Sequence, residues 1–129
     1  MNIIINQEPI PKGRARTVRI GGKTMSFTPK KTVDAESSIR AQISQGKEFY
    51  AAGIPLSISL AFYVNRPPSV SKKRLYPVTR PDIDNYCKLI FDACNKYLWQ
   101  DDSQIINLAA MKRYGSPPRI EIDIEPVTQ

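Results

Sequence analysis

The sequence predicts an α/β (α+β) fold in which two main helices pack on a mixed β-sheet of about five or six strands. Three observations favour it. Short β-branched or alternating apolar segments occur near both ends and in the middle of the chain, and two longer segments with helix-start signals separate them. The 129 residues, 41% of them hydrophobic and 24% charged, suit one domain with a core of its own, residues 1–129.

The first strand and a hairpin are expected before residue 28. The β-branched run "NIIIN", residues 2–6, is typical of a strand, and Pro9 and Pro11 end it. A second strand precedes Gly21-Gly22 and a third runs from Thr24 to Phe27, which predicts a hairpin that turns at the glycines.

A first helix is expected from about Pro29 to Ala52. Thr28 is a typical N-cap, Pro29 suits the first helical position, and Gly53 suits the end. The larger apolar residues are few. At 3.6 residues per turn, Ile39, Ile43 and Tyr50 fall within about 40° of one another, which predicts one narrow buried face.

The second half of the chain predicts three strands and a second helix. The alternating segment 55–65 indicates a strand, and a helix from about Asp84 to Tyr97 follows a basic loop. Two further strands, "QIINLAAMKRY" and "RIEIDIE", are joined by "GSPP", which favours a hairpin. In the last strand we expect Ile120, Ile122 and Ile124 to point inward.

Composition limits the chemistry that this protein can perform. The absence of histidine excludes histidine bases, histidine-ligated zinc and Ser-His-Asp triads. There is no glycine-rich phosphate loop, so no small-molecule cofactor is expected. Cys87 and Cys94 would lie about 10 Å apart along one helix, too far for a disulfide, and we expect small, buried free thiols.

The net charge of +7 and the pI near 9.6 favour an acidic polymer as partner. No segment has the length and apolar character of a membrane span, and the N-terminus lacks the layout of a secretory signal, so a cytoplasmic location without membrane contact is expected.

Negative charge nevertheless gathers in one stretch of this basic chain. Five of the twelve acidic residues lie within 21 residues: Asp82, Asp84, Asp92, Asp101 and Asp102. Carboxylate oxygens are hard ligands that suit Mg²⁺ or Mn²⁺. Asp82 and Asp84 can face one ion, and Lys88 follows Asp84 by one helical turn, so this set can build a phosphodiesterase centre. The same residues also suit a helix cap, an ion pair and a solvated turn, and spacing alone leaves both interpretations open.

A larger pattern bears on that choice. "RPDIDNYCKLIFDACN", followed by "LWQDDSQI" and a strand leading to "KRYG", resembles the RusA family of Holliday-junction resolvases over about residues 80–113. The resemblance implies that Asp82, Asp84 and Asp102 bind metal and are catalytic, with Lys88 as the functional lysine. Asp101 and Asn85 would support the site, while Asp92, as a partner of Lys88 or Lys96, would be structural. The resemblance further implies a Mg²⁺-dependent homodimer that places paired nicks in four-way junction DNA.

The expected geometry raises a question about this site. A straight helix from Asp84 to Tyr97 would span about 21 Å, with Asp82 and Asp84 at one end and the Asp101-Asp102 doublet at the other. Either the helix ends early and "KYLWQ" returns in extended form, or the doublet of a second subunit completes the site; we expect the shared site.

Two basic stretches are expected to contact phosphates. One holds Lys72, Lys73, Arg74 and Arg80, and the other lies around the hairpin and includes Arg14 and Arg16. A less selective nuclease for branched or flapped DNA, or a noncatalytic DNA-binding protein, would show the same basic surface.

Overall fold

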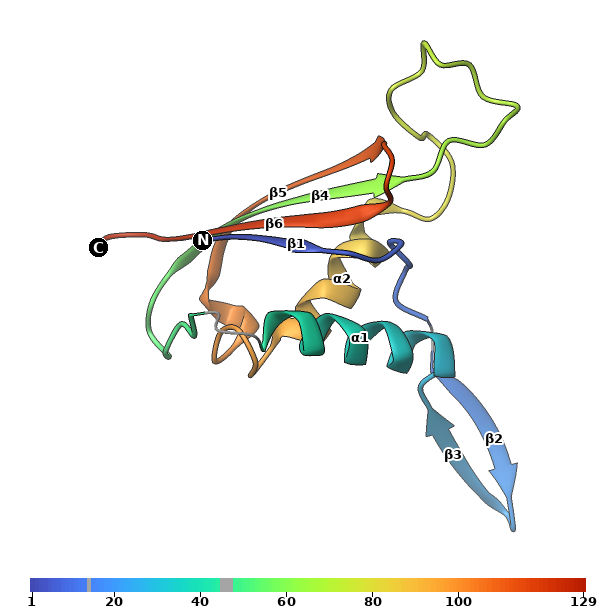
Figure 1. The fold of residues 1–129 in the computed structure, drawn as a ribbon. Helices are drawn as coiled ribbons and strands as arrows, with labels where there is room; N and C mark the ends of the chain where they lie inside the picture. Colours follow the sequence, from blue (N-terminus) through green and yellow to red (C-terminus); the bar gives the residue numbers. More distant parts are fainter. Residues whose placement is uncertain (14, 45–47) are drawn as a thin grey trace.

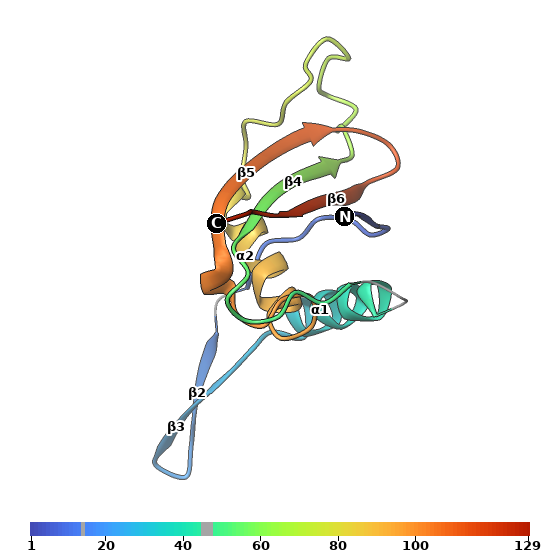
Figure 2. The ribbon, with the colours of Figure 1, turned by 90° about the vertical axis from the view of Figure 1, so that its left-hand side faces the viewer.

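The structure, a computed structural model, describes residues 1–13, 15–44 and 48–129. Four strands form the main sheet: β1 (Asn2–Ile5), β4 (Leu56–Val64), β5 (Ile105–Tyr114) and β6 (Arg119–Pro126), in the order β1-β6-β4-β5. β4 pairs in parallel with β5, and the other pairs are antiparallel, so the sheet is mixed. The helices α1 (Lys30–Ile43) and α2 (Ile83–Cys94) lie on one face of this sheet (Figures 1 and 2). The predicted α+β class is confirmed.

The core lies between the sheet and the two helices. Alternate residues of β4 and β6 point into it and are buried, as the alternation in the sequence predicts. From the helices, Ile39 of α1 and Ile90 of α2 are fully buried. The buried strand residues that form the floor of this core are Leu56, Ile58, Leu60, Phe62, Ile120, Ile122 and Ile124.

The predicted hairpin between the last two strands is wrong. β5 and β6 exist, but each pairs with β4, which lies between them: Ile58 of β4 aligns with Leu108 of β5 and with Ile124 of β6. Residues 115–118 cross the end of β4, where the Gly115 N–H donates to the Val64 carbonyl at 3.0 Å. β4 contributes the most buried strand face, and flanking it on both edges satisfies its main-chain hydrogen bonds.

The first helix ends earlier than predicted, at Ile43 rather than near Ala52. Tyr50 is instead extended: its N–H donates to the Leu98 carbonyl at 2.9 Å, and its carbonyl accepts from Gln100 at 3.1 Å. Tyr50 is therefore buried as predicted, but through tertiary strand-like pairing. The N-cap is Pro29, not Thr28, because the Pro29 carbonyl accepts the first helical N–H groups, those of Thr32 and Val33.

The second helix also ends early, at Cys94, and residues 95–99 fold back in a tight turn. The N–H groups of Tyr97 and Leu98 both donate to the Cys94 carbonyl, and that of Lys96 donates to the Trp99 carbonyl at 2.8 Å. Lys96 has a φ of 71°, the left-handed conformation that a reversal of this kind requires. The helix therefore ends early, as the first of the two geometries left open by the sequence requires, but the residues after it form a turn rather than the extended return expected with it.

β2 (Arg16–Ile20) and β3 (Lys23–Phe27) form the predicted hairpin and a separate two-stranded sheet. The turn residues Gly21 and Gly22 have φ values of 56° and 78°, which side chains rarely adopt. The hairpin, called the arm below, projects away from the main sheet and helices (Figure 1).

Cys87 and Cys94 are free and buried, as predicted. Burial raises the pKa of the Cys94 thiol to about 12, which keeps it protonated and unreactive. Among the described residues, no helix has both the length and the apolar character needed to cross a bilayer.

Candidate active site between α2 and β5

A groove of about 430 Å³ lies between α2 and the edge strand β5, and it collects most of the acidic cluster. Its apolar walls come from both elements, and its charged residues come from α2 and from the segment just before β5. We call it the α2–β5 groove. The apolar residues are Ile83, Cys87, Phe91, Leu108 and Ala110, and the charged residues are Asp84, Lys88, Asp92 and Asp102.

Asp82 and Asp84 lie at the N-terminus of α2. Asp82, not Asp84, takes the N-cap position, and its carbonyl accepts the Asn85 N–H at 3.1 Å while its carboxylate makes no capping bond. Asp84 belongs to the first turn and lines the groove, whereas Asp82 does not. The partial positive charge of the helix N-terminus favours both carboxylates.

Asp102 is held in place by two side chains that the sequence analysis did not assign to the site. The Trp99 indole Nε1–H donates to Asp102 Oδ1 at 2.6 Å, and the Asp102 N–H donates to Asn95 Oδ1 at 3.1 Å. Trp99 is itself fully buried, so it is a rigid support. Both supports come from the turn after α2, and no pattern in that turn predicts their contacts.

Asp101 shapes the turn that carries Asp102. Its carboxylate accepts the Ser103 N–H at 3.0 Å, and its own N–H donates to Gln104 Oε1 at 2.8 Å, which makes a capping box on the short 3₁₀ helix Asp102–Gln104. The hydrogen bonds from Ser103 lower the pKa of Asp101. The pattern Asp-x-x-Gln is readable in the sequence as such a box.

Asp102 has the opposite electrostatic environment. Burial raises its pKa, and the neighbouring carboxylates of Asp92 and Asp101 raise it further, against the hydrogen bond from Trp99 and the charge of Lys96. Its hydrogen bonds with Trp99 and Asn95, which directly follow α2, place Asp102 toward the Asp92 end of that helix. Asp84 lies about 12 Å along the helix axis from Asp92.

Asp92 pairs with Lys12 rather than with the predicted Lys88 or Lys96. Lys12 Nζ lies 3.1 Å from Asp92 Oδ2 and 2.6 Å from Glu36 Oε1. Burial lowers the pKa of Lys12, but the hydrogen bonds to Glu36 and Asp92 outweigh it and leave the pKa raised. Lys88, by contrast, is exposed and has no recorded ion pair among the described residues, so its ammonium is available to a ligand.

The donor chemistry of the site suits a divalent cation, but the described residues of one chain do not bring three such donors together. Asp82, Asp84 and Asp102 offer hard carboxylate oxygens, and burial, together with the neighbouring carboxylates of Asp92 and Asp101, raises the pKa of Asp102. Within residues 1–13, 15–44 and 48–129, no three acidic or cysteine side chains are close enough to hold one ion. Among the described residues, Asn85 makes hydrogen bonds through its main chain only: its N–H donates to the Asp82 carbonyl at 3.1 Å, and its carbonyl accepts the Lys12 N–H at 3.0 Å.

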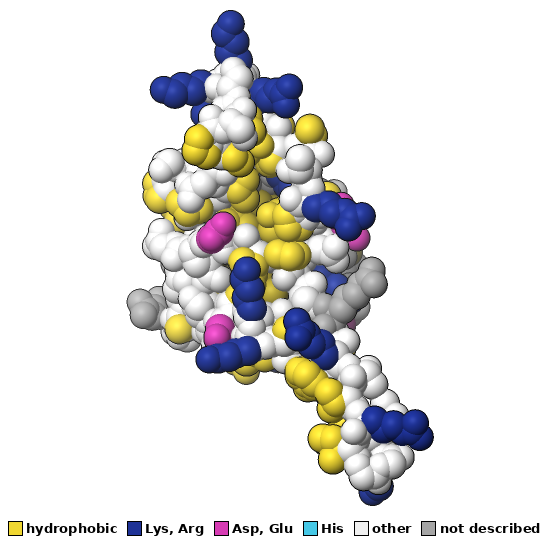
Figure 3. Space-filling view, turned by 90° about the vertical axis from the view of Figure 1, so that its right-hand side faces the viewer, with side chains coloured by type: hydrophobic (Ala, Val, Ile, Leu, Met, Phe, Trp, Pro, Cys, Tyr) yellow, Lys and Arg dark blue, Asp and Glu magenta, His cyan; other side chains and the backbone are white. Residues whose placement is uncertain are grey.

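The loop between β4 and α2 carries one predicted basic group. Lys72, Lys73, Arg74 and Arg80 are all exposed there. In Figure 3, Lys and Arg side chains surround the tip of this loop and recur on the face below it.

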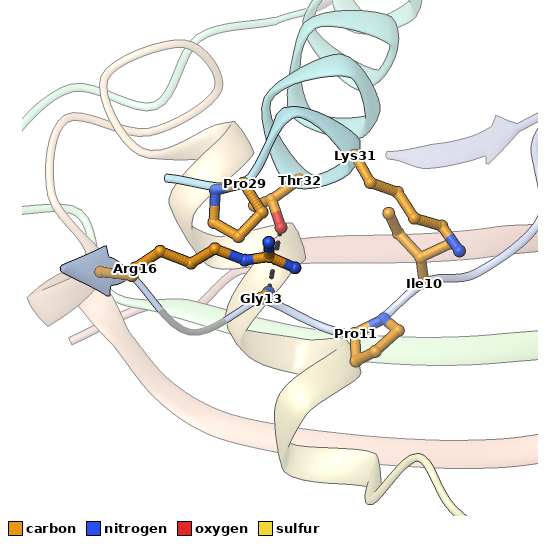
Figure 4. Close-up of a pocket in the computed structure, with 8 residues that line it drawn as sticks. Ile10, Pro11, Gly13, Arg16, Pro29, Lys31 and Thr32 are labelled. Carbon is orange, nitrogen blue, oxygen red and sulfur yellow. Dashed lines mark hydrogen bonds between the residues drawn. The ribbon is translucent and has the colours of Figure 1, made fainter. Parts of the chain in front are cut away.

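Arg16, from the second basic group, opens β2 and lines another cavity of about 430 Å³ at the base of the arm. In the wall of this cavity the Gly13 N–H donates to the Thr32 hydroxyl at 3.0 Å (Figure 4). Lys31 of α1 lines the same cavity. Arg14, predicted with this group, lies outside the described residues.

Comparison with known proteins places this arrangement in a family. Residues 6–125 match the family model "Endodeoxyribonuclease RusA". The chain is 32% identical to the uncharacterized protein YqaN of Bacillus subtilis (strain 168), over 94% of this chain and 92% of that protein. It is 36% identical to "Crossover junction endodeoxyribonuclease rusA" of Lactococcus phage r1t, over 70% of each chain. A match over nearly the whole sequence, together with a groove that gathers the acidic residues, shows that this chain belongs to the RusA family of endodeoxyribonucleases.

Proposed function

We propose that this protein is a Mg²⁺-dependent Holliday-junction resolvase, which hydrolyses phosphodiester bonds in four-way junction DNA by paired cuts. The observation that carries the proposal is the α2–β5 groove, which is lined by Asp84, Lys88 and Asp102 in a chain of the RusA family. Recombination and repair of DNA, in a prophage context, are the processes such an activity would serve, and they would place the protein in the cytoplasm.

Asp82, Asp84 and Asp102 would bind the metal, and Mn²⁺ should substitute for Mg²⁺ because it accepts the same oxygen ligands. The bound metal would polarise the scissile phosphate and lower the pKa of the attacking water. Lys88 would bind the phosphate oxygen on which negative charge develops. Asp101 would support the site by fixing the Asp102 turn, and Asn85 by orienting a carboxylate of the first helical turn.

A homodimer with shared sites accounts for the separation of the ligands. Asp82 and Asp84 stand at one end of α2, and Asp102 lies near Asp92, two turns away. An Asp102 supplied by a second copy would complete a site that one chain leaves open. A twofold dimer would also give two equivalent sites, as two symmetric cuts require.

DNA would be held by cations on two sides of this centre. Lys72, Lys73, Arg74 and Arg80 would bind phosphates from the loop, and so would Arg14 and Arg16, from the basic stretch of the sequence around the hairpin. These contacts would add affinity without sequence information.

Cleavage of a synthetic four-way junction tests the proposal. The wild-type protein should cut the junction in Mg²⁺ or Mn²⁺ but not in EDTA, and should cut linear duplex poorly. Asp82→Asn should be inactive while it still binds the junction. Equal cutting of flaps and junctions would indicate a less selective nuclease, and junction binding without cutting under any metal would indicate a noncatalytic DNA-binding protein.

A further inference from the structure

The arm of residues 16–27 lacks a partner within the described part of the chain. All ten residues of β2 and β3 are exposed, and the two strands pair only with each other. A two-stranded hairpin by itself is marginally stable in water, because it buries little apolar surface. A surface outside the described chain is therefore needed to cover it.

The arm has two chemically different faces. Successive side chains of a strand alternate between faces, and the register pairs Val18 with Met25 and Ile20 with Lys23. One face therefore carries an apolar row, Val18, Ile20, Met25 and Phe27, whose exposed fractions run from 38% to 61%. The other face carries Thr17, Arg19, Thr24 and Ser26. Figure 3 shows the apolar side chains along one side of the arm and Lys and Arg near its tip.

The charge around this apolar row is of one sign. From Pro9 to Val33 the sequence holds seven Lys or Arg residues and no Asp or Glu. An apolar protein surface is compatible with such an arm, but the unbroken positive charge favours a polyanion. Ile and Met are among the side chains that proteins wedge between base steps from the minor groove, and the row has one of each near the turn.

We infer that the arm inserts into the minor groove of a duplex arm of the DNA substrate, with Ile20 and Met25 as the apolar wedge and Arg19 and Lys23 on the flanking phosphates. The inference rests on the proposed function in that the substrate is DNA. The position of the arm fits, because Lys12, four residues before β2, donates its N–H to the Asn85 carbonyl at the N-terminal end of α2. A duplex held by the arm would therefore lie beside Asp82 and Asp84.

The test compares two variants that change equally exposed isoleucines. Ile20 and Ile106 are both 61% exposed, but Ile106 lies on β5, away from the arm. Ile20→Ser combined with Met25→Ser should weaken binding to a four-way junction at least about tenfold in EDTA, with the salt dependence of binding unchanged, because no charge is removed. Ile106→Ser should bind like the wild type. Arg19→Gln with Lys23→Gln should instead lower the salt slope by about 2.

Base unstacking gives a second readout. A junction that carries 2-aminopurine in its duplex arms should become more fluorescent when the wild-type protein binds, and this increase should be lost with the Ile20→Ser, Met25→Ser variant. Light scattering should give the same mass for this variant and for the wild type.

Two results would overturn the inference. One is unchanged junction affinity and 2-aminopurine signal in the wedge variant. The other is a fall in mass on light scattering with DNA affinity retained, which would assign the apolar row to a second copy of the chain. Either result leaves the proposed function standing if the wild-type protein cuts the junction in Mg²⁺, so the two failures are distinguishable.

Discussion

Asp102 illustrates how single residues define this site. Its carboxylate is anchored by the Trp99 indole at 2.6 Å, yet burial and the adjacent carboxylates of Asp92 and Asp101 raise its pKa. The ionised Asp102 carboxylate, which a cation would bind, therefore destabilises the folded protein when no cation is present. Asp101, one residue earlier, carries a charge that the Ser103 hydrogen bonds stabilise.

This contrast predicts opposite effects of two neighbouring substitutions in EDTA. Because the folded-state pKa of Asp102 is raised, its protonated form favours folding, and that benefit is lost as pH rises through the folded pKa. Asp102→Asn should therefore raise the melting temperature at neutral pH, and the gain should vanish below the ordinary Asp pKa of about 3.9. Mg²⁺-dependent cleavage should fall at least about 10²-fold.

Asp101→Asn is the matched comparison. In the wild-type protein the pKa of Asp101 is lowered, so its ionised carboxylate stabilises the fold at every pH above the pKa of Asp101 in the unfolded chain. The Asp101→Asn variant loses this stabilisation and should melt at a lower temperature at neutral pH. Thermal melts across pH check both variants, and a lower neutral-pH melting temperature for Asp102→Asn would contradict the assigned environment.

Trp99→Phe removes the indole donor and keeps an aromatic side chain. We expect it to cost about 1–3 kcal/mol of unfolding free energy and to weaken cleavage, because Asp102 loses its support. The measurement is a double-mutant cycle by denaturation with Asp102→Asn. Additive effects in the cycle would show that the hydrogen bond does not couple the two residues.

At the scale of elements, β4 organises the molecule. It is paired on both edges, by β5 and β6, and its alternate residues are fully buried against the helices. β5 is an edge strand that α2 covers incompletely, and the groove is the space that remains. The α2–β5 groove is thus a consequence of where the helix layer stops.

Two leucines on the same face of the sheet test the difference in helix cover between β4 and β5. Leu60 of β4 is 3% exposed and Leu108 of β5 is 42% exposed. Leu60→Ala should lower the free energy of unfolding by about 2–5 kcal/mol, because it leaves a cavity. Leu108→Ala should cost less than about 1 kcal/mol. Urea denaturation gives both values, and similar losses would mean that the groove is a packed part of the core.

The loop before α2 is expected to act through charge alone. Neutralising Lys72, Lys73 and Arg74 to Gln should weaken junction binding and lower the slope of log affinity against log salt by about 0.9 per lost phosphate contact. Arg119→Gln is the control, because Arg119 is paired with Glu121 at 2.8 Å on the sheet. Titrations at several salt concentrations measure the slopes, and an unchanged slope would remove the loop from the DNA contacts.

At the scale of the whole molecule, the question is how many chains make one site. The described residues of one chain hold the acidic side chains in two places, Asp82 and Asp84 at the start of α2 and Asp102 near its end. A second copy that brings its own Asp102 to the first group would complete the ligand set twice in a twofold dimer.

Mixing two inactive variants tests this arrangement. If sites are shared, a heterodimer of Asp82→Asn and Asp102→Asn chains has one intact and one doubly substituted site. Co-refolded mixtures should therefore regain about a quarter of the wild-type sites and should nick junctions singly. Each variant alone, refolded in the same way, is the control. No regained nicking would place all ligands of a site in one chain.

Much of the fold and of the candidate site could be predicted from local pattern. Residue spacing predicts the alternation in β4 and β6 and the polar edge of α2 formed by Asp84, Lys88 and Asp92, because burial follows the period of the strand or helix. The paired glycines likewise predict the turn of the arm. The family was likewise readable from the motif between Arg80 and Arg113.

What failed were the long-range choices. The helix predicted from about Pro29 to Ala52 ends early, and Tyr50 instead forms main-chain hydrogen bonds with Leu98 and Gln100. The predicted last hairpin does not form, because β4 lies between β5 and β6. Hydrogen bonds between distant segments decide such cases, and no local window contains them.

The sequence by itself therefore determined most of the elements, the family and the acidic residues of the candidate site, since these depend on neighbours within a few turns of the chain. Only the tertiary structure decided that Trp99 and Asn95 hold Asp102, that Lys12 holds Asp92, and that Asp84 and Asp102 line one groove. The physical reason is that each of these contacts joins separate segments: the chain must reverse after Cys94 to place Asp102, β5 must pack beside α2 to form the groove, and the segment before the arm must pack on α2 to pair Lys12 with Asp92. That geometry is fixed by the packing and hydrogen bonding of the whole core.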